Sequence, residues 1–66
     1  MKYIIKDDRD VLQKGFVRKG VCYTYWFDPA DFPDKTPKYF DTYESAAEFR
    51  TKLKISEFFT KIVAVV

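Results

Sequence analysis

The chain has 66 residues, of which 47% are apolar, 20% are aromatic and 33% are charged. This length allows one domain, residues 1–66, and this composition excludes a disordered chain, which would have few aromatics and a large net charge. Twelve basic and ten acidic residues leave a net charge of +2, too small to indicate nucleic-acid binding unless the cations cluster.

The first part of the chain predicts two strands joined by a polar turn. Residues 2–6 (KYIIK) are rich in strand-forming side chains, and the DDRD at residues 7–10 favours a turn because short polar side chains bond to nearby backbone. Residues 11–18 predict the second strand, in which Gly15 indicates a bulge or a bend.

A hairpin is predicted between residues 11 and 27. Lys19-Gly20 has the length of a tight two-residue turn, in which Gly20 can adopt a positive φ angle. Residues 21–27 (VCYTYWF) then return as the third strand, with large apolar side chains for both faces. By alternation, one face carries Val21, Tyr23, Tyr25 and Phe27, and the other carries Cys22, Thr24 and Trp26.

A long loop and a helix follow the hairpin. Residues 28–38 contain all three prolines and predict a loop, and a loop this long in so small a domain is often functional or mobile. The helix is predicted from about Thr42 to about Lys54, with Asp41 as its N-cap and Glu44 at the capping-box position. Its apolar stripe consists of Tyr43, Ala46, Phe49 and Leu53.

Residues 58–66 (FFTKIVAVV) predict the last strand, and their near-continuous apolarity favours a central or well-covered position. The order β-β-β-α-β predicts an α+β fold, in which a three-stranded antiparallel meander and a C-terminal strand have one helix packed on one face. We expect the last strand to reach the sheet by a right-handed crossover through the helix and to lie beside the first strand, parallel to it.

One helix covers only one face of such a sheet, so the other face stays at least partly exposed. Two alternatives remain open for it. The loop could fold back and cover the second face with Phe32, or the aromatic residues could form a platform for a partner or a second copy of the chain. The second alternative predicts a non-enzymatic protein-binding module that uses either the aromatic sheet face or the 28–38 loop. Its partner-binding residues are Tyr23, Tyr25, Trp26 and Phe32.

Binding of single-stranded nucleic acid is the alternative function. Sheet surfaces bind single strands when aromatic side chains stack on bases and neighbouring cations contact phosphates. The residues that fit this pattern are Lys14, Arg18, Lys19, Tyr23 and Tyr25. A solvated hairpin tip explains the same cations, and the ordered aromatic motifs of known RNA-binding sheet domains are missing.

No catalytic, cofactor-binding or metal-binding residues are predicted, and we do not expect an enzyme. The chain has no histidine, two glycines and one cysteine, which excludes a disulfide within the chain, a histidine-activated nucleophile and a glycine-rich phosphate loop. We expect Cys22 to be a buried, unreactive thiol. The acidic clusters lack the calcium-loop pattern and are explained by turns and caps; they are Asp7, Asp8 and Asp10, and Asp28, Asp31 and Asp34.

A cytoplasmic location is expected. No stretch reaches the ~18 apolar residues of a membrane span. The first ten residues, MKYIIKDDRD, do not have the pattern of a signal peptide, and the single thiol agrees with a reducing compartment.

The chain resembles very small proteins encoded by phages and prophages of low-GC Gram-positive bacteria. The resemblance rests on MKYIIK at the start, YTYWF in the middle, KYFDTYESAAEF before and into the helix, and KIVAVV at the end, and the proline-rich loop departs from the compact layout. It implies a phage accessory protein in the host cytoplasm that binds a host protein or self-associates. Some such proteins antagonise bacterial defence, including anti-CRISPR proteins. No functional residues can be assigned to this chain from the resemblance.

Overall fold

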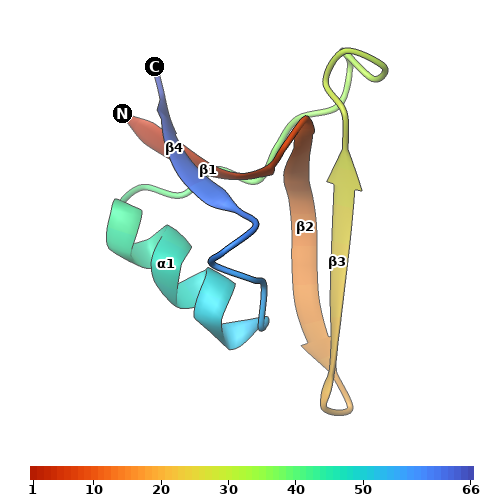
Figure 1. Cartoon of the computed structure of the whole chain (residues 1–66), viewed down its shortest axis with the longest axis vertical. Helices are drawn as coiled ribbons and strands as arrows, with labels where there is room; N and C mark the ends of the chain where they lie inside the picture. Colours follow the sequence, from red (N-terminus) through yellow and green to blue (C-terminus); the bar gives the residue numbers. More distant parts are fainter.

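The structure is a computed structural model that describes all residues, 1–66, and it contains four strands and one helix (Figure 1). The elements are β1 (Lys2–Asp7), β2 (Asp10–Arg18), β3 (Val21–Phe27), α1 (Tyr43–Lys52) and β4 (Lys61–Val65). All neighbouring strands are antiparallel and form one open sheet in the order β3-β2-β1-β4. The predicted α+β class and the predicted order of elements are confirmed.

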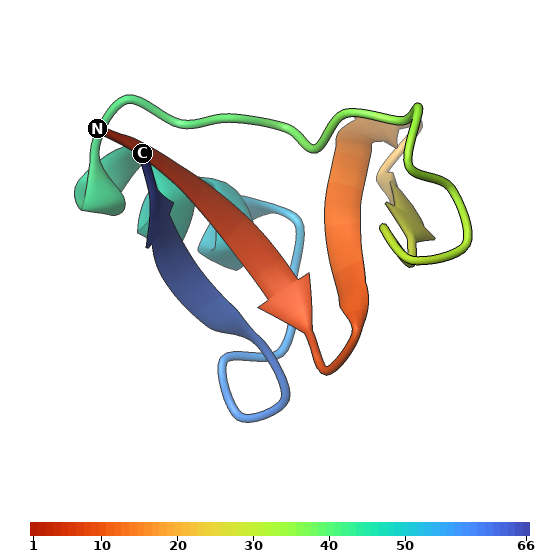
Figure 2. The ribbon, with the colours of Figure 1, turned by 90° about the horizontal axis from the view of Figure 1, so that it is seen from above.

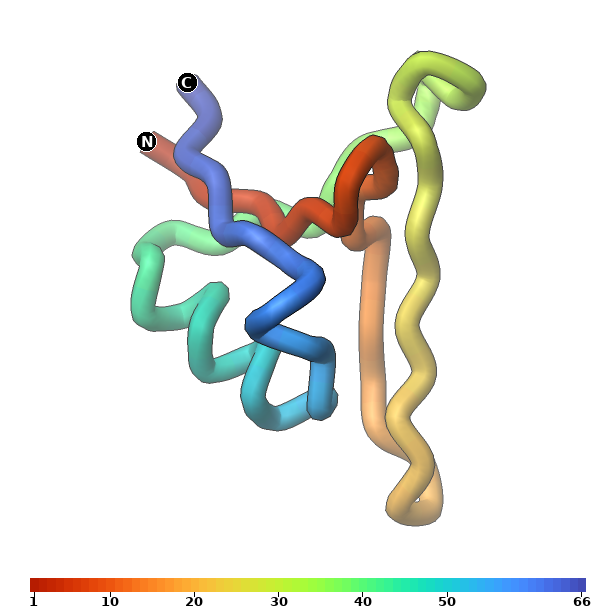
Figure 3. The backbone as a smooth tube through the Cα atoms, viewed as in Figure 1, coloured from red at the N-terminus to blue at the C-terminus, as the bar shows by residue number.

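The β2–β3 hairpin forms as the sequence predicts. Lys19 and Gly20 have φ angles of 53° and 77°, and two successive positive φ angles are the requirement of a type I′ turn. Arg18 pairs with Val21 across this turn. The hairpin is long, and its tip extends past the end of α1 (Figure 3).

Gly15 leaves room beside β2 for the side chains of Phe49 and Leu53. Of the bulge or bend that the sequence predicted at Gly15, the bulge does not lie at the glycine itself. A Cβ atom at Gly15 would lie 2.8 Å from Cδ1 of Leu53 and 3.2 Å from Cζ of Phe49. The bulge is located instead between Leu12 and Lys14.

The substitution Gly15→Ala should therefore lower the free energy of unfolding by about 1–3 kcal/mol, because the added methyl group overpacks the contact with Leu53. Urea denaturation followed by circular dichroism measures this change. Val17→Ala, at an exposed position of the same strand, is the control and should stay within about 0.5 kcal/mol of the original protein. Equal stability of both variants would contradict the close packing of Leu53 and Phe49 against Gly15.

β4 lies beside β1 as predicted, but it runs antiparallel to β1, so the prediction of a parallel crossover was wrong. The path of the chain after β3 explains the difference. Lys38 donates a backbone hydrogen bond of 2.9 Å to Leu12, and Phe40 bridges to Tyr3, so this segment runs back across the sheet to the start of β1. The helix then returns the chain to the far end of β1, and β4 runs the opposite way (Figure 2).

β4 is shorter than predicted, and it forms an edge of the sheet instead of occupying a central or well-covered position. Phe58 and Phe59 belong to the turn before the strand and are 87% and 76% exposed. Thr60 is buried, and its hydroxyl donates to the carbonyl of Ser56. This bond closes the turn that carries the two phenylalanines.

The N-cap of α1 is Thr42, one residue after the predicted cap. Its Oγ1 accepts a hydrogen bond of 3.0 Å from the backbone N–H of Ser45. The predicted cap, Asp41, instead forms an ion pair with Lys2, and this hydrogen-bonded cation lowers the pKa of the Asp41 carboxyl. The ion pair links the start of β1 to the start of the helix.

α1 ends at Lys52 rather than at about Lys54, because Lys54 has a left-handed backbone with a φ angle of 56°. Of the predicted apolar stripe, Ala46 and Leu53 are buried and Phe49 is half-buried. Tyr43 stays exposed, with its ring edge-on to Tyr3 at 6.2 Å. No helix in the structure has the length and apolarity needed to cross a membrane.

Apolar side chains pack on both faces of the sheet. On the face covered by α1, the buried residues are Ile5, Leu12, Phe40 and Ala46. On the opposite face, the buried residues are Ile4, Val11 and Phe27, with Val63 and Val65 partly buried beside them. The second cluster reaches the hairpin only at the paired residues Val11 and Phe27, so the rest of the outer face of the hairpin is left without cover.

Candidate protein-binding surface on the hairpin

Three aromatic side chains gather on the face of the hairpin that points away from α1. We call Phe16, Tyr23 and Tyr25 the aromatic cluster; they are 42%, 41% and 44% exposed. The ring centroid of Phe16 lies 5.3 Å from that of Tyr23 and 6.1 Å from that of Tyr25, with interplanar angles of 24° and 25°. The rings are therefore stacked on one another, and together they form a continuous aromatic surface.

The bulge in β2 creates this cluster. In a regular strand, Leu12 and Phe16 would point to the same face, because they are an even number of residues apart. The bulge between Leu12 and Lys14 reverses this alternation, so Leu12 stays in the core while Phe16 points outward opposite Tyr23. The same shift turns Gly15 toward the helix.

Three cations flank the aromatic cluster. Nζ of Lys14 lies 4.7 Å from the ring centroid of Tyr25. Arg18 and Lys19 line a shallow hollow of about 440 Å³ together with the three rings and Val21. None of these cations forms an ion pair, since the one salt bridge in the chain lies at the start of α1. All five residues of the nucleic-acid alternative thus lie together on the hairpin.

The predicted partner-binding residues do not all share this surface. Tyr23 and Tyr25 belong to the aromatic cluster, whereas Trp26 lies on the opposite face, half-buried against the core beneath the helix. Nε1 of Trp26 donates to Oγ1 of Thr24 at 3.0 Å. Cys22 lies on this helix-side face as well and is half-buried rather than fully buried.

Phe32 stands apart from both the cluster and the core. It is 49% exposed, it contributes to neither buried cluster, and Nζ of Lys35 lies 4.5 Å from its ring centroid. The loop therefore does not complete a second core over the open face, which was the first of the two alternatives for this segment.

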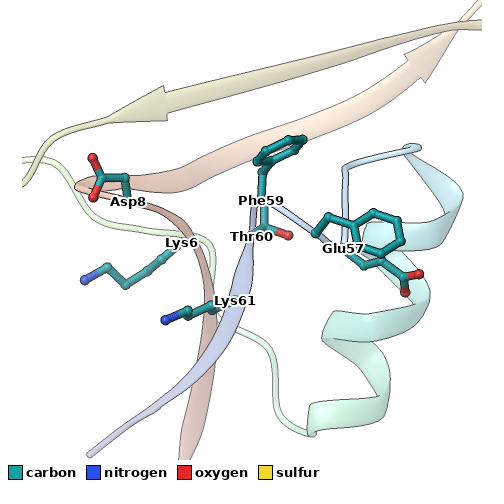
Figure 4. Close-up of a pocket in the computed structure, with 7 residues that line it drawn as sticks. Lys6, Asp8, Glu57, Phe59, Thr60 and Lys61 are labelled. Carbon is teal, nitrogen blue, oxygen red and sulfur yellow. The ribbon is translucent and has the colours of Figure 1, made fainter.

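A second hollow lies beside the two exposed phenylalanines at the start of β4 (Figure 4). Its lining residues are Lys6, Asp8, Glu57, Phe58, Phe59, Thr60 and Lys61. In Figure 4 the carboxylate of Glu57 points away from the ammonium groups of Lys6 and Lys61. The Glu57 carboxylate therefore does not meet the two lysines across this hollow. No three carboxylate or thiol groups in the chain are placed to hold a metal ion.

The fold and this surface define a small α+β domain with one face covered by a helix and an open aromatic patch on the other. Comparisons of the chain with protein-family models, curated protein sequences and solved structures give no match.

Proposed function

We propose that this protein is a non-enzymatic protein-binding module that docks a partner protein through the aromatic cluster. The supporting observation is the exposure of three stacked rings on a sheet face that no other element covers. Tyrosine and phenylalanine bring large contact area at small entropic cost, and aromatic residues are enriched at protein interfaces. These three rings belong to neither buried core cluster, so they are available for contact with a partner.

The cations around the cluster indicate the chemistry of the partner. Lys14, Arg18 and Lys19 have no acidic partner within the chain, so they are free to pair with carboxylates at the rim of an interface. Complementary charge at a rim speeds association and selects the partner. The partner we propose is a bacterial host protein with an apolar patch bordered by acidic side chains, bound in the host cytoplasm by a phage accessory protein.

Single-stranded nucleic acid is the second candidate ligand, because the five residues that would bind it lie side by side on the hairpin. Nucleobases stack on free ring faces. In the aromatic cluster, Phe16 stacks against both tyrosines and Lys14 lies over Tyr25, so these ring faces are already partly occupied. This occupancy favours a protein partner.

A pull-down of the tagged protein from a bacterial lysate, with and without nuclease and read by mass spectrometry, separates the two candidates. We expect a specific host protein that is retained after nuclease treatment. A captured mixture that disappears with nuclease would indicate that the aromatic cluster binds nucleic acid. The affinity for single strands should then fall steeply with salt concentration.

A further inference from the structure

β3 is an edge strand without the features that normally prevent pairing with another chain. Its sequence, Val21–Phe27, contains no charged residue, no proline and no glycine. Edge strands of natural proteins are usually protected by such residues or by a covering element. In Figures 1 and 3, no other segment lies along the outer side of β3.

The turn determines which backbone groups are free at this edge. Residues that flank a two-residue turn exchange both backbone hydrogen bonds, so Arg18 and Val21 form such a pair. Hydrogen-bonded and non-hydrogen-bonded pairs alternate along an antiparallel ladder. The N–H and C=O groups of Cys22, Thr24 and Trp26 therefore point away from β2, toward the open edge.

The sequence of β3 is nearly symmetric about Thr24. When two copies pair antiparallel with a two-fold axis at Thr24, Tyr23 lies opposite the partner's Tyr25, and Cys22 lies opposite the partner's Trp26. The free backbone groups then meet at Thr24 itself and at the Cys22 and Trp26 positions. Because paired residues point to the same face, the two aromatic clusters join into one surface, and cross-strand aromatic pairs are favourable.

This register also brings opposite charges together. The basic hairpin tip and the acidic loop lie at opposite ends of β3 (Figure 1). In an antiparallel pair, Gly20 lies beside the partner's Asp28, so Arg18 and Lys19 approach the partner's loop. The acidic residues of that loop are Asp28, Asp31 and Asp34. The two-fold axis repeats this contact at the other end of the interface.

We propose that the protein forms a two-fold dimer in which the β3 strands of two copies pair antiparallel about Thr24. The resulting sheet is continuous across both chains. This interface uses the edge of β3 and leaves the rings of the aromatic cluster open. It shares Arg18 and Lys19 with the rim proposed for the partner protein, whereas Lys14 stays free for that partner.

Charge reversal tests the dimer by sedimentation of the full chain from micromolar to millimolar concentration. The tip variant R18E/K19E and the loop variant D31K/D34K should each dimerise at least about tenfold more weakly than the original protein, because each places like charges in contact. Mixing the two variants should restore the dimer, since the acidic tip then meets the basic loop and the basic tip meets the acidic loop. A monomeric original protein, or a mixture no tighter than either variant, would overturn the proposal.

Cross-linking tests the register. The α-carbons of a hydrogen-bonded antiparallel pair lie about 5.5 Å apart, within disulfide range, so the variant C22A/T24C should form a disulfide-linked dimer on mild oxidation. Cys22 of the original protein lies about 13 Å along the strands from the partner's Cys22 and should stay reduced. Equally fast linkage through Cys22 would rule out this register. A monomeric result in both tests would leave the aromatic cluster available to a partner protein.

Discussion

Replacing Leu12 with alanine is expected to lower the free energy of unfolding by about 2–5 kcal/mol, the cost of a large cavity in a core. Leu12 is fully buried between the sheet and the helix, where it packs with Ile5, Phe40 and Ala46. The total stability of small domains is about 5–15 kcal/mol, and a chain of this length is expected near the low end. A large part of the population should therefore be unfolded at moderate temperature.

Urea denaturation followed by Trp26 fluorescence measures the effect, because Trp26 packs against the same core cluster. Tyr25→Ala is a matched control from the same hairpin. Its ring is exposed on the opposite face, so its loss should cost much less. An unchanged denaturation midpoint for Leu12→Ala would contradict the packing of Leu12 in the core cluster with Ile5, Phe40 and Ala46.

Replacing Tyr25 with alanine is expected to weaken binding of the captured partner by about 30-fold or more, as for a residue at the centre of an interface. The ring of Tyr25 is close to both the ring of Phe16 and the ammonium group of Lys14, so its loss removes contact area and loosens both neighbours. Isothermal titration calorimetry with the purified partner measures the change. Tyr25→Phe keeps the ring and should retain most of the affinity.

Two further variants define the boundary of the surface. Phe58→Ala removes an exposed ring outside the hairpin and should leave affinity unchanged. Phe32→Ala tests the loop residue that the sequence grouped with the tyrosines. We expect a small effect on affinity, because Phe32 has no ring contact with the aromatic cluster and does not line the hollow beside it. If Phe32→Ala lowered the affinity as much as Tyr25→Ala, the loop would also belong to the interface.

The turn, the strands and the helix could be predicted because each depends mainly on residues within the element itself. The turn at Lys19-Gly20 follows from the need for positive φ angles, and residues 21–27 and 2–6 lie in strands because their side chains suit a half-buried sheet. The helix followed from the spacing of Ala46, Phe49 and Leu53.

Which residues form the aromatic cluster was harder to predict, because their placement depends on one unpaired position in β2. Alternation correctly separates Tyr23 and Tyr25 from Trp26, but it cannot say which side the helix covers. The bulge after Leu12 moves Phe16 to the outer face, and no residue in this part of β2 signals it clearly except the nearby Gly15. Phe16 was therefore missed as a member of the cluster.

The direction of β4 depended on the extended segment after the loop. The bonds from Lys38 to Leu12 and between Phe40 and Tyr3 join residues far apart in the sequence, and no local pattern indicates them. The turn at Phe58 and Phe59 was also not predicted. Their apolarity suggested a strand, but the hydrogen bond from Thr60 to Ser56 closes a turn that contains both residues.

The most direct test of the proposed docking surface is a set of parallel pull-downs after nuclease treatment, with the captured host protein quantified by mass spectrometry. The set compares the original protein with Y23S/Y25S and with F58S/F59S, which remove paired exposed rings inside and outside the aromatic cluster. We predict that Y23S/Y25S loses the partner while F58S/F59S retains it. Retention by Y23S/Y25S, or equal loss in both variants, would contradict docking through the hairpin.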